Sequence, residues 1–121
     1  MSKRLLAVGA DSTPESRRRF RELLVTTPGA ADRISGVILY DETIRQTPSE
    51  GRSFPELLKT QGMLTGIKFD TGAKPLAGAA GETITEGLDG LRERLREYHE
   101  LGARCAKWRA GITGGAARPG R

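Results

Sequence analysis

Three strand-like segments alternate with helical patterns along this chain of 121 residues, and this alternation is the feature that most restricts its fold. The segments are Ile34 to Tyr40 (ISGVILY), Met63 to Phe69 (MLTGIKF) and Ala103 to about Ala110 (ARCAKWRA). Their first residues lie 29 and 40 positions apart, which leaves room for a helix in each connection. Connections of this length make right-handed βαβ units, so we expect the three strands to pair in parallel.

The segments around the first two strands carry helix signals. One helix is expected to begin at residues 12–15, where Thr13 can cap with Pro14 in the first position or Ser12 can pair with Glu15. A second, short helix begins at the capping box of residues 53–56 and ends at a glycine, residue 62. The first strand, ISGVILY, is nearly continuously apolar, which is typical of a strand buried on both faces.

The last connection contains a Gly-rich stretch and then a long periodic pattern. We expect residues 72–81 to form a loop, and Thr83 or Thr85 to cap a helix from about Glu86 to Leu101. Gly102 then stands where a left-handed residue commonly ends a helix. Both a doubly wound sheet and a TIM-type barrel contain such (β/α) units, and three strands do not decide between them.

The length suits one domain, which we place at residues 1–110, and residues 111–121 (GITGGAARPGR) read as a flexible Gly/Arg tail. The apolar runs are too short to cross a membrane, so we expect no membrane partner. A single cysteine, Cys105, and a single histidine leave no basis for an intramolecular disulfide, a Cys-based zinc site or a His-rich site. We therefore expect a cytoplasmic protein without metal or cofactor.

A net charge of +5 raises the question of nucleic-acid binding. Arginines cluster at residues 17–21 and 92–96 and could contact phosphates. However, glutamates are interleaved with them, as on a solvated helix face, and no aromatic stacking pattern accompanies them. We expect no nucleic-acid partner.

The carboxyl ends of the strands carry the candidate site. Lys68 and Asp70 are two residues apart and share one face of the second strand, and Lys107 and Arg109 share one face of the third. Asp41-Glu42 ends the first strand, so these charges are expected to converge on one rim that suits a phosphorylated ligand. Solvated strand-end charges are the alternative. We expect the nearby cysteine to be a small core residue rather than a nucleophile.

Longer motifs give a more specific indication. In order along the chain, they are SGVILYDETIRQ (residues 35–46), GRSFPELLKTQG (51–62), GIKFDTG (66–72), PLAG (75–78), GETITEGLDGLRERLREY (81–98) and AKWRA (106–110). Across residues 2–110 the chain resembles class I fructose-bisphosphate aldolase, which forms a Schiff base with its substrate. The resemblance implies a (β/α)8 barrel that cleaves fructose 1,6-bisphosphate into dihydroxyacetone phosphate and glyceraldehyde 3-phosphate in glycolysis, without a metal.

The same resemblance implies roles for five residues. Lys107 matches the lysine that contacts the substrate hydroxyls near the breaking bond and assists proton transfer, and Arg109 belongs to the same site. Lys68 resembles the lysine that helps hold the C6 phosphate, with Asp70 as its carboxylate neighbour. Arg4 resembles the arginine that reaches the C1 phosphate. We therefore expect Lys107 to be catalytic and the other four residues to bind substrate.

The chain also departs from the family. It matches only strands two to four of the barrel, so we expect an incomplete barrel of three strands with flanking helices. The family's first strand, its acid/base glutamates and its Schiff-base lysine have no counterpart here, and the isolated chain is expected to be inactive. Two other interpretations remain: a small non-catalytic module that binds sugar phosphates, and a basic scaffold for nucleic acid. The family is commonly tetrameric.

Overall fold

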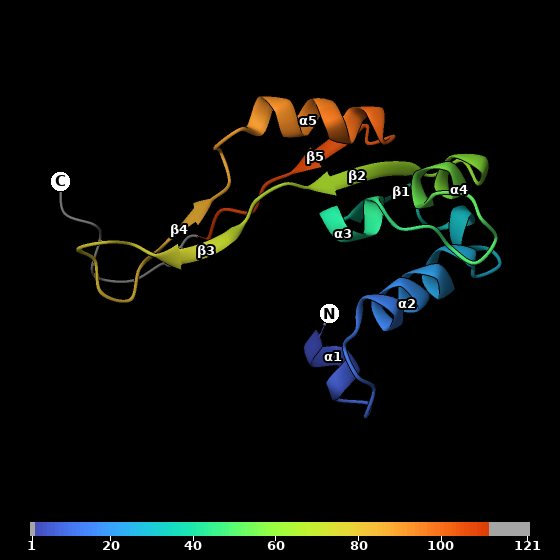
Figure 1. Ribbon diagram of the computed structural model, residues 1–121, viewed down its shortest axis with the longest axis horizontal. Helices are drawn as coiled ribbons and strands as arrows, with labels where there is room; N and C mark the ends of the chain where they lie inside the picture. The colour runs from blue at the N-terminus through green and yellow to red at the C-terminus, as the bar shows by residue number, and fades with distance from the viewer. Residues whose placement is uncertain (1, 112–121) are drawn as a thin grey trace.

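The computed structural model describes residues 2–111, and a three-stranded parallel sheet forms its centre (Figure 1). The strands are β1 (Gly36–Leu39), β2 (Leu64–Lys68) and β5 (Cys105–Lys107), in the spatial order β1-β2-β5. Gly36 pairs with Leu64 at one end and Lys68 pairs with Lys107 at the other. The predicted parallel βαβ units are confirmed, and the carboxyl ends of β2 and β5 lie side by side.

Two of the helices, α2 and α4, begin where the capping signals predicted. The structure contains α1 (Ser2–Leu6), α2 (Pro14–Thr26), the 3-10 helix η1 (Ala30–Asp32), α3 (Asp41–Ile44), α4 (Phe54–Thr60) and α5 (Leu91–Glu100). Thr13 Oγ1 accepts the Ser16 amide at 3.0 Å, so the first of the two capping alternatives for α2 is correct. Ser53 and Glu56 form the predicted capping box of α4. Each cap pairs amide groups that the first helical turn leaves unpaired.

One face of the sheet packs against the helices and forms the core. Leu39 of β1 and Ile67 of β2 are buried there against Phe54 and Leu58 of α4 and Tyr98 of α5. Val37, on the same face of β1, is partly buried against this cluster. The alternating side chains of the strands therefore divide the sheet into a packed face and an opposite face.

The opposite face is uncovered within residues 2–111. It carries Ile38, which is 52% exposed, Leu64, which is 58% exposed, and the exposed Cys105. The prediction of a first strand buried on both faces is wrong, and so is the prediction that Cys105 is a core residue. The physical reason is that three parallel strands with helices on one side cover only that side, whereas a closed barrel would enclose the other.

The segment between β2 and α5 also differs from the prediction. Residues 72–81 are not simply a loop: β3 (Gly72–Pro75) and β4 (Thr83–Glu86) form an antiparallel hairpin that extends away from α2 and α4 (Figure 1). Because Thr83 and Thr85 belong to β4, neither caps the helix, and α5 begins only at Leu91 after a left-handed Gly90. The sequence TITE is rich in β-branched residues, which favours a strand.

The third strand is shorter than predicted and ends at Lys107. After it, the Trp108 ring packs on Phe69 with 5.2 Å between ring centroids, and the Arg109 carbonyl accepts a hydrogen bond from Thr85 at 2.8 Å. The first contact joins the segment to the end of β2, and the second joins it to β4 of the hairpin. No helix within residues 2–111 is long and apolar enough to cross a bilayer. The predicted tail, apart from its first residue, lies outside the described residues.

Candidate functional site

The carboxyl end of β2 holds a lysine in a defined position. Lys68 Nζ donates to the Asp70 carboxylate at 2.6 Å and to the Asp70 carbonyl at 3.0 Å. The Gly72 amide donates to the same carboxylate oxygen at 3.2 Å. Asp70 is only 4% exposed, whereas the Lys68 side chain is 33% exposed. The carboxylate therefore anchors an ammonium group that still reaches solvent.

The Lys68 ammonium holds the pKa of the Asp70 carboxyl below its usual range. A hydrogen bond to the charged form of a carboxyl favours that form, and here it outweighs the opposing effect of burial. The aspartate is therefore negatively charged at neutral pH and can balance one of the cationic groups around it.

A second ammonium group and an aromatic ring lie on the same face of the sheet. Lys107 is the register partner of Lys68 and is exposed, and within residues 2–111 its side chain has no hydrogen bond or ion pair. The Tyr40 ring, two residues beyond Ile38 on this face, has its centroid 5.5 Å from Lys68 Nζ. The structure thus brings Lys68, Asp70 and Lys107 together, and Arg109 follows two residues after Lys107.

Two carboxylates that were expected beside the lysines form ion pairs with arginines instead. Glu42 forms an ion pair with Arg17 at 2.6 Å, and Asp41 forms one with Arg45 at 3.0 Å. The prediction that these carboxylates converge with the lysines is wrong, because α3 begins directly after β1 and turns both toward the helices. Arg4 lies on α1, which Figure 1 shows apart from the ends of β2 and β5.

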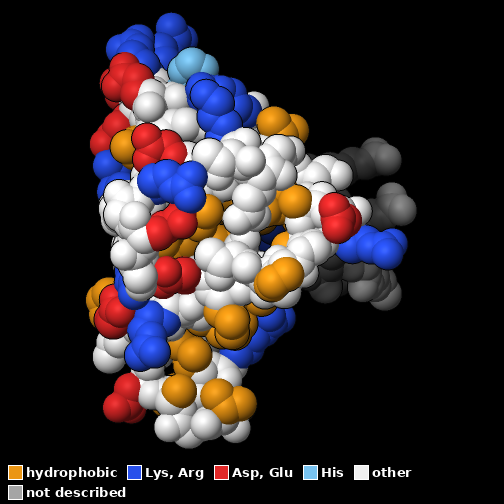
Figure 2. Space-filling view, turned by 90° about the vertical axis from the view of Figure 1, so that its right-hand side faces the viewer, with side chains coloured by type: hydrophobic (Ala, Val, Ile, Leu, Met, Phe, Trp, Pro, Cys, Tyr) orange, Lys and Arg blue, Asp and Glu red, His pale blue; other side chains and the backbone are white. Residues whose placement is uncertain are grey.

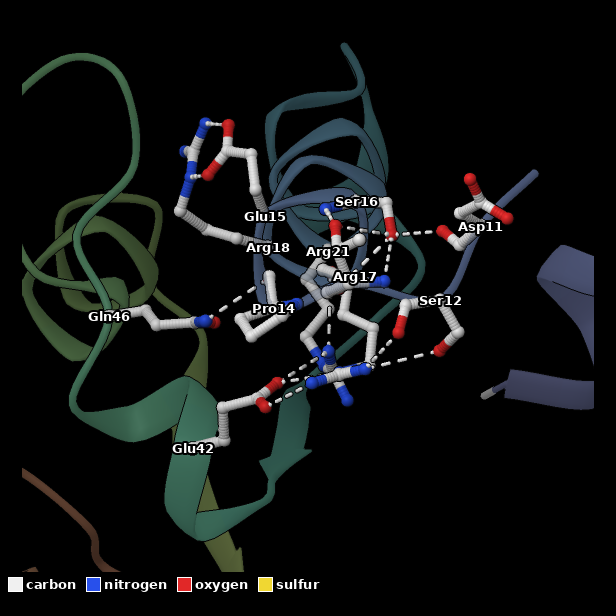
Figure 3. A network of polar contacts seen from close by, with 11 residues as sticks. Asp11, Ser12, Pro14, Glu15, Ser16, Arg17, Arg18, Arg21, Glu42 and Gln46 are labelled. Atoms are coloured by element: carbon white, nitrogen blue, oxygen red, sulfur yellow. Dashed lines mark hydrogen bonds and ion pairs between the residues drawn. The ribbon is translucent and has the colours of Figure 1, made fainter.

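Three arginines of α2, Arg17, Arg18 and Arg21, form hydrogen bonds or ion pairs within the chain. Arg17 donates two hydrogen bonds to Glu42, at 2.9 and 2.6 Å, so the pair is bidentate (Figure 3). Arg18 donates to Glu15 and Glu22, both at 2.7 Å. On the face drawn in Figure 2, acidic and basic side chains alternate along one margin instead of separating into a basic patch. Several of the interleaved charges are therefore paired with one another on the surface.

Sequence reasoning missed two neighbours of the site. Tyr40 could have been placed beside Lys68 from strand alternation, because it continues the face of Ile38. Arg94 could not, although its guanidinium donates to the carbonyl of Phe69, the residue between Lys68 and Asp70. Three arginines alternate at the start of α5, and nothing in that pattern marks the middle one.

Oxygen and nitrogen ligands for a metal are not grouped anywhere in the described part of the chain: no three histidine, cysteine, aspartate or glutamate residues lie close enough to hold an ion. The site is instead an arrangement of two ammonium groups with a single buried carboxylate. Such an arrangement can attract and orient an anion, because the carboxylate compensates only one of the two positive charges.

The Lys68–Asp70 pair should make the free energy of unfolding depend on pH in the acid range. Because the folded-state pKa of Asp70 is lowered, its contribution to the free energy of unfolding is complete above the ordinary aspartate pKa of about 4. This contribution is lost as the pH falls through the lowered folded-state value. We expect urea unfolding between about pH 5 and pH 2 to show a flatter pH dependence in Asp70→Asn than in wild type. The exposed-site control Asp32→Asn should keep the wild-type slope, and equal slopes in all three proteins would contradict the prediction.

A parallel sheet with cationic side chains at its strand ends defines an α/β protein of the kind that binds anionic ligands at that edge. Comparison with known proteins identifies the family. The family described as "Glycolytic: Fructose-bisphosphate aldolase class-I" matches residues 1–121. The chain belongs to the class I fructose-bisphosphate aldolase family.

Individual relatives support the same family assignment. The chain is 57% identical over 113 residues to a probable class 1 fructose-bisphosphate aldolase of Xylella fastidiosa, covering 93% of this chain and 34% of that protein. It is 50% identical to the cytosolic fructose-bisphosphate aldolase 6 of Arabidopsis thaliana, covering 98% of this chain and 33% of that protein. The chain therefore spans about a third of the length of the curated relatives it matches.

A solved structure supports the fold assignment. The fructose-bisphosphate aldolase of Plasmodium falciparum superposes with a TM-score of 0.85 at 41% identity, covering 89% of this chain and 31% of that chain. The likeness confirms that the parallel sheet and its flanking helices are part of a TIM barrel that is not closed here. Of the two folds left open by the strand pattern, the barrel is correct.

Proposed function

We propose that this chain supplies one part of the substrate site of a class I fructose-bisphosphate aldolase, the enzyme that reversibly cleaves fructose 1,6-bisphosphate into dihydroxyacetone phosphate and glyceraldehyde 3-phosphate. The observation that carries the proposal is the pairing of Lys68 with Lys107 at the carboxyl ends of β2 and β5. Asp70 fixes one of these lysines and leaves the other unpaired within the described residues. A sugar bisphosphate has the charge and the hydroxyl groups that such a pair can bind.

The two lysines would have different tasks. The Lys68 ammonium, held by Asp70, would bind a phosphate group in a fixed place. Lys107 is exposed and free of an ion-pair partner among residues 2–111, so it can approach the substrate hydroxyls and assist proton transfer. Arg109 would add a third cationic group two residues further along. Arg4 is assigned to the other phosphate from the family resemblance alone.

The proposal requires no metal and no cofactor, because the family's chemistry uses a Schiff base formed by a lysine. None of the five lysines of this chain matches that position, so this chain would contribute binding and proton transfer rather than the covalent step. The proposed unit is residues 1–110. A cytoplasmic location is supported by the relatives described as cytosolic, and assembly into a homo-oligomer by the resemblance.

A second candidate function is a non-catalytic module that binds a sugar phosphate. It is favoured by one observation: the two lysines and their aspartate are complete within a single chain, whereas the Schiff-base amine is not part of it. Binding without turnover by the isolated chain is expected under both proposals. Turnover on addition of the missing (β/α) units would favour the enzyme.

The test of the binding site is Lys68→Ala. Removing the ammonium group should weaken the binding of fructose 1,6-bisphosphate about tenfold or more, because hydrogen bonds to charged groups are worth about 1.5–3 kcal/mol. Wild-type affinity should also fall as salt is added. Isothermal titration calorimetry measures both effects, with Lys59→Ala on the exposed side of α4 as the matched control. Equal affinities of Lys68→Ala and wild type would show that the strand-end charges are only solvated.

A further inference from the structure

Arg94 of α5 joins two backbone segments next to the candidate site. Its side chain is half-buried, and Nη1 donates to the Phe69 carbonyl at 3.1 Å. Nη2 donates to the carbonyls of Gly87 and, at 3.4 Å, Asp89. One guanidinium therefore connects the end of β2 with the loop that follows the hairpin.

The loop and the end of β2 are in close contact at this point. Gly87 has a φ of +123°, and a Cβ atom placed on it would lie 2.9 Å from the Thr71 amide nitrogen and 3.2 Å from Asp70 Cα. The Thr71 amide also donates to the Glu86 carbonyl at 2.9 Å. The backbone of Asp70 is thus pressed against the loop, and only glycine satisfies both the conformation and the space.

We propose that Arg94 is a positioning residue for anion binding: by holding Phe69 and the 87–89 loop together, it fixes the backbone that presents Lys68 and Asp70. The inference deepens the proposed function and rests on it for the identity of the anion, a sugar phosphate. The Phe69 carbonyl lies between the two residues of the pair, so a shift of this peptide changes the distance from Nζ to the carboxylate. Nothing in the proposal requires Arg94 to touch the substrate.

An arginine suits this task better than a lysine. The planar guanidinium presents several N–H groups in a rigid fork, so it can donate to carbonyls of two different segments at once. A lysine ammonium is a point charge on a flexible stem. It can bind the carbonyl of one segment and move with it, so it does not hold the two segments together. The charge of residue 94 and its fork geometry can therefore be separated by substitution.

The experiment measures the pKa of the Asp70 carboxyl by NMR in the complete 121-residue chain labelled at aspartate. The groups that lower the pKa of this carboxyl are the Lys68 ammonium at the end of β2 and the backbone amides of Arg109 and Gly72. Arg94→Met and Arg94→Lys are compared with wild type. Arg92→Met, which removes an exposed arginine of the same helix, is the matched control.

We expect the pKa of Asp70 to rise toward the ordinary value in both Arg94 variants and to stay low in Arg92→Met. A role in overall stability alone would leave the pKa of Asp70 unchanged in every folded variant, and this result would overturn the proposal. A rise in Arg94→Met without one in Arg94→Lys would also overturn it, because charge rather than the fork would then be responsible. If Arg94→Met does not fold, the folded Arg94→Lys protein decides alone.

Calorimetry with fructose 1,6-bisphosphate completes the test. Affinity should fall about three- to tenfold in Arg94→Met and remain within about twofold of wild type in Arg92→Met. The two proposals fail in different ways. If wild type binds no fructose 1,6-bisphosphate, the proposed function is wrong while the pKa of Asp70 still reports on positioning. If wild type and Arg94→Met bind equally well, the positioning role is wrong and the proposed function stands.

Discussion

Purified alone, this chain is expected to cleave fructose 1,6-bisphosphate no faster than the uncatalysed reaction. Covalent catalysis in this family needs an amine that forms an iminium with the ketone, and none of the lysines here matches that position. The two lysines at the site are unsuited to replace it. Lys68 Nζ is bound to the Asp70 carboxylate at 2.6 Å and to the Asp70 carbonyl at 3.0 Å, so it is not free to approach a ketone carbon. Lys107 has no carboxylate or other base within hydrogen-bonding distance among residues 2–111.

Two measurements check this expectation. A coupled assay for glyceraldehyde 3-phosphate should give no signal above background. Borohydride reduction in the presence of dihydroxyacetone phosphate should give no covalent adduct by mass spectrometry. The full-length Xylella fastidiosa relative, assayed in parallel, is the positive control for both. A stoichiometric adduct on any lysine of this chain would contradict the prediction and would identify that lysine as a nucleophile.

Local signals predicted much of the fold. The capping boxes at Thr13 and Ser53 fix where α2 and α4 begin, because a side-chain cap and the amides it pairs with lie within one turn. Strand alternation placed Lys68 and Asp70 on one face, and parallel pairing brought Lys107 beside them. Each of these inferences depends on residues that are close in sequence or related by a simple repeat.

The errors have a common cause in longer-range geometry. The sequence predicts too early a start for α5 because the threonines of β4 resemble helix caps, and only their pairing with β3 shows them to be a strand. The exposure of Ile38 depends on what covers the sheet, which its own sequence does not encode. Arg94 acts on backbone carbonyls 25 and 7 residues away, and backbone groups leave no signature in a sequence.

The carboxylates after β1 illustrate the same point for the site. Asp41 and Glu42 follow a strand just as Asp70 does, yet Arg45 after α3 pairs with Asp41 and Arg17 of α2 pairs with Glu42. Position relative to a strand end therefore identifies candidate residues, but the cation with which each carboxylate pairs depends on the helices around it. Predicting that outcome requires the packing of α2 against the sheet.

Because its sheet is open, we expect the isolated chain to be marginally stable and to self-associate. Within residues 2–111, β1 and β5 each have one edge without a neighbouring strand, and their free backbone groups can pair with another chain. The uncovered face adds exposed apolar surface at Ile38 and Leu64. Each Å² of apolar area left in water loses about 25 cal/mol of the stabilisation that burial would give. The net stability of an intact domain is only about 5–15 kcal/mol, so this loss is large.

Analytical ultracentrifugation over a range of concentrations and near-UV circular dichroism of Trp108 during heating measure the two effects. We expect concentration-dependent association and a broad transition at low temperature. The double variant Ile38→Thr/Leu64→Thr should associate less, because threonine keeps the β-propensity of the strands and removes apolar surface. Leu88→Thr changes a leucine that is also exposed but lies outside the sheet, so it should associate like wild type. A sharp transition at high temperature from a monodisperse monomer would show instead that three strands with helices on one face form a self-sufficient domain.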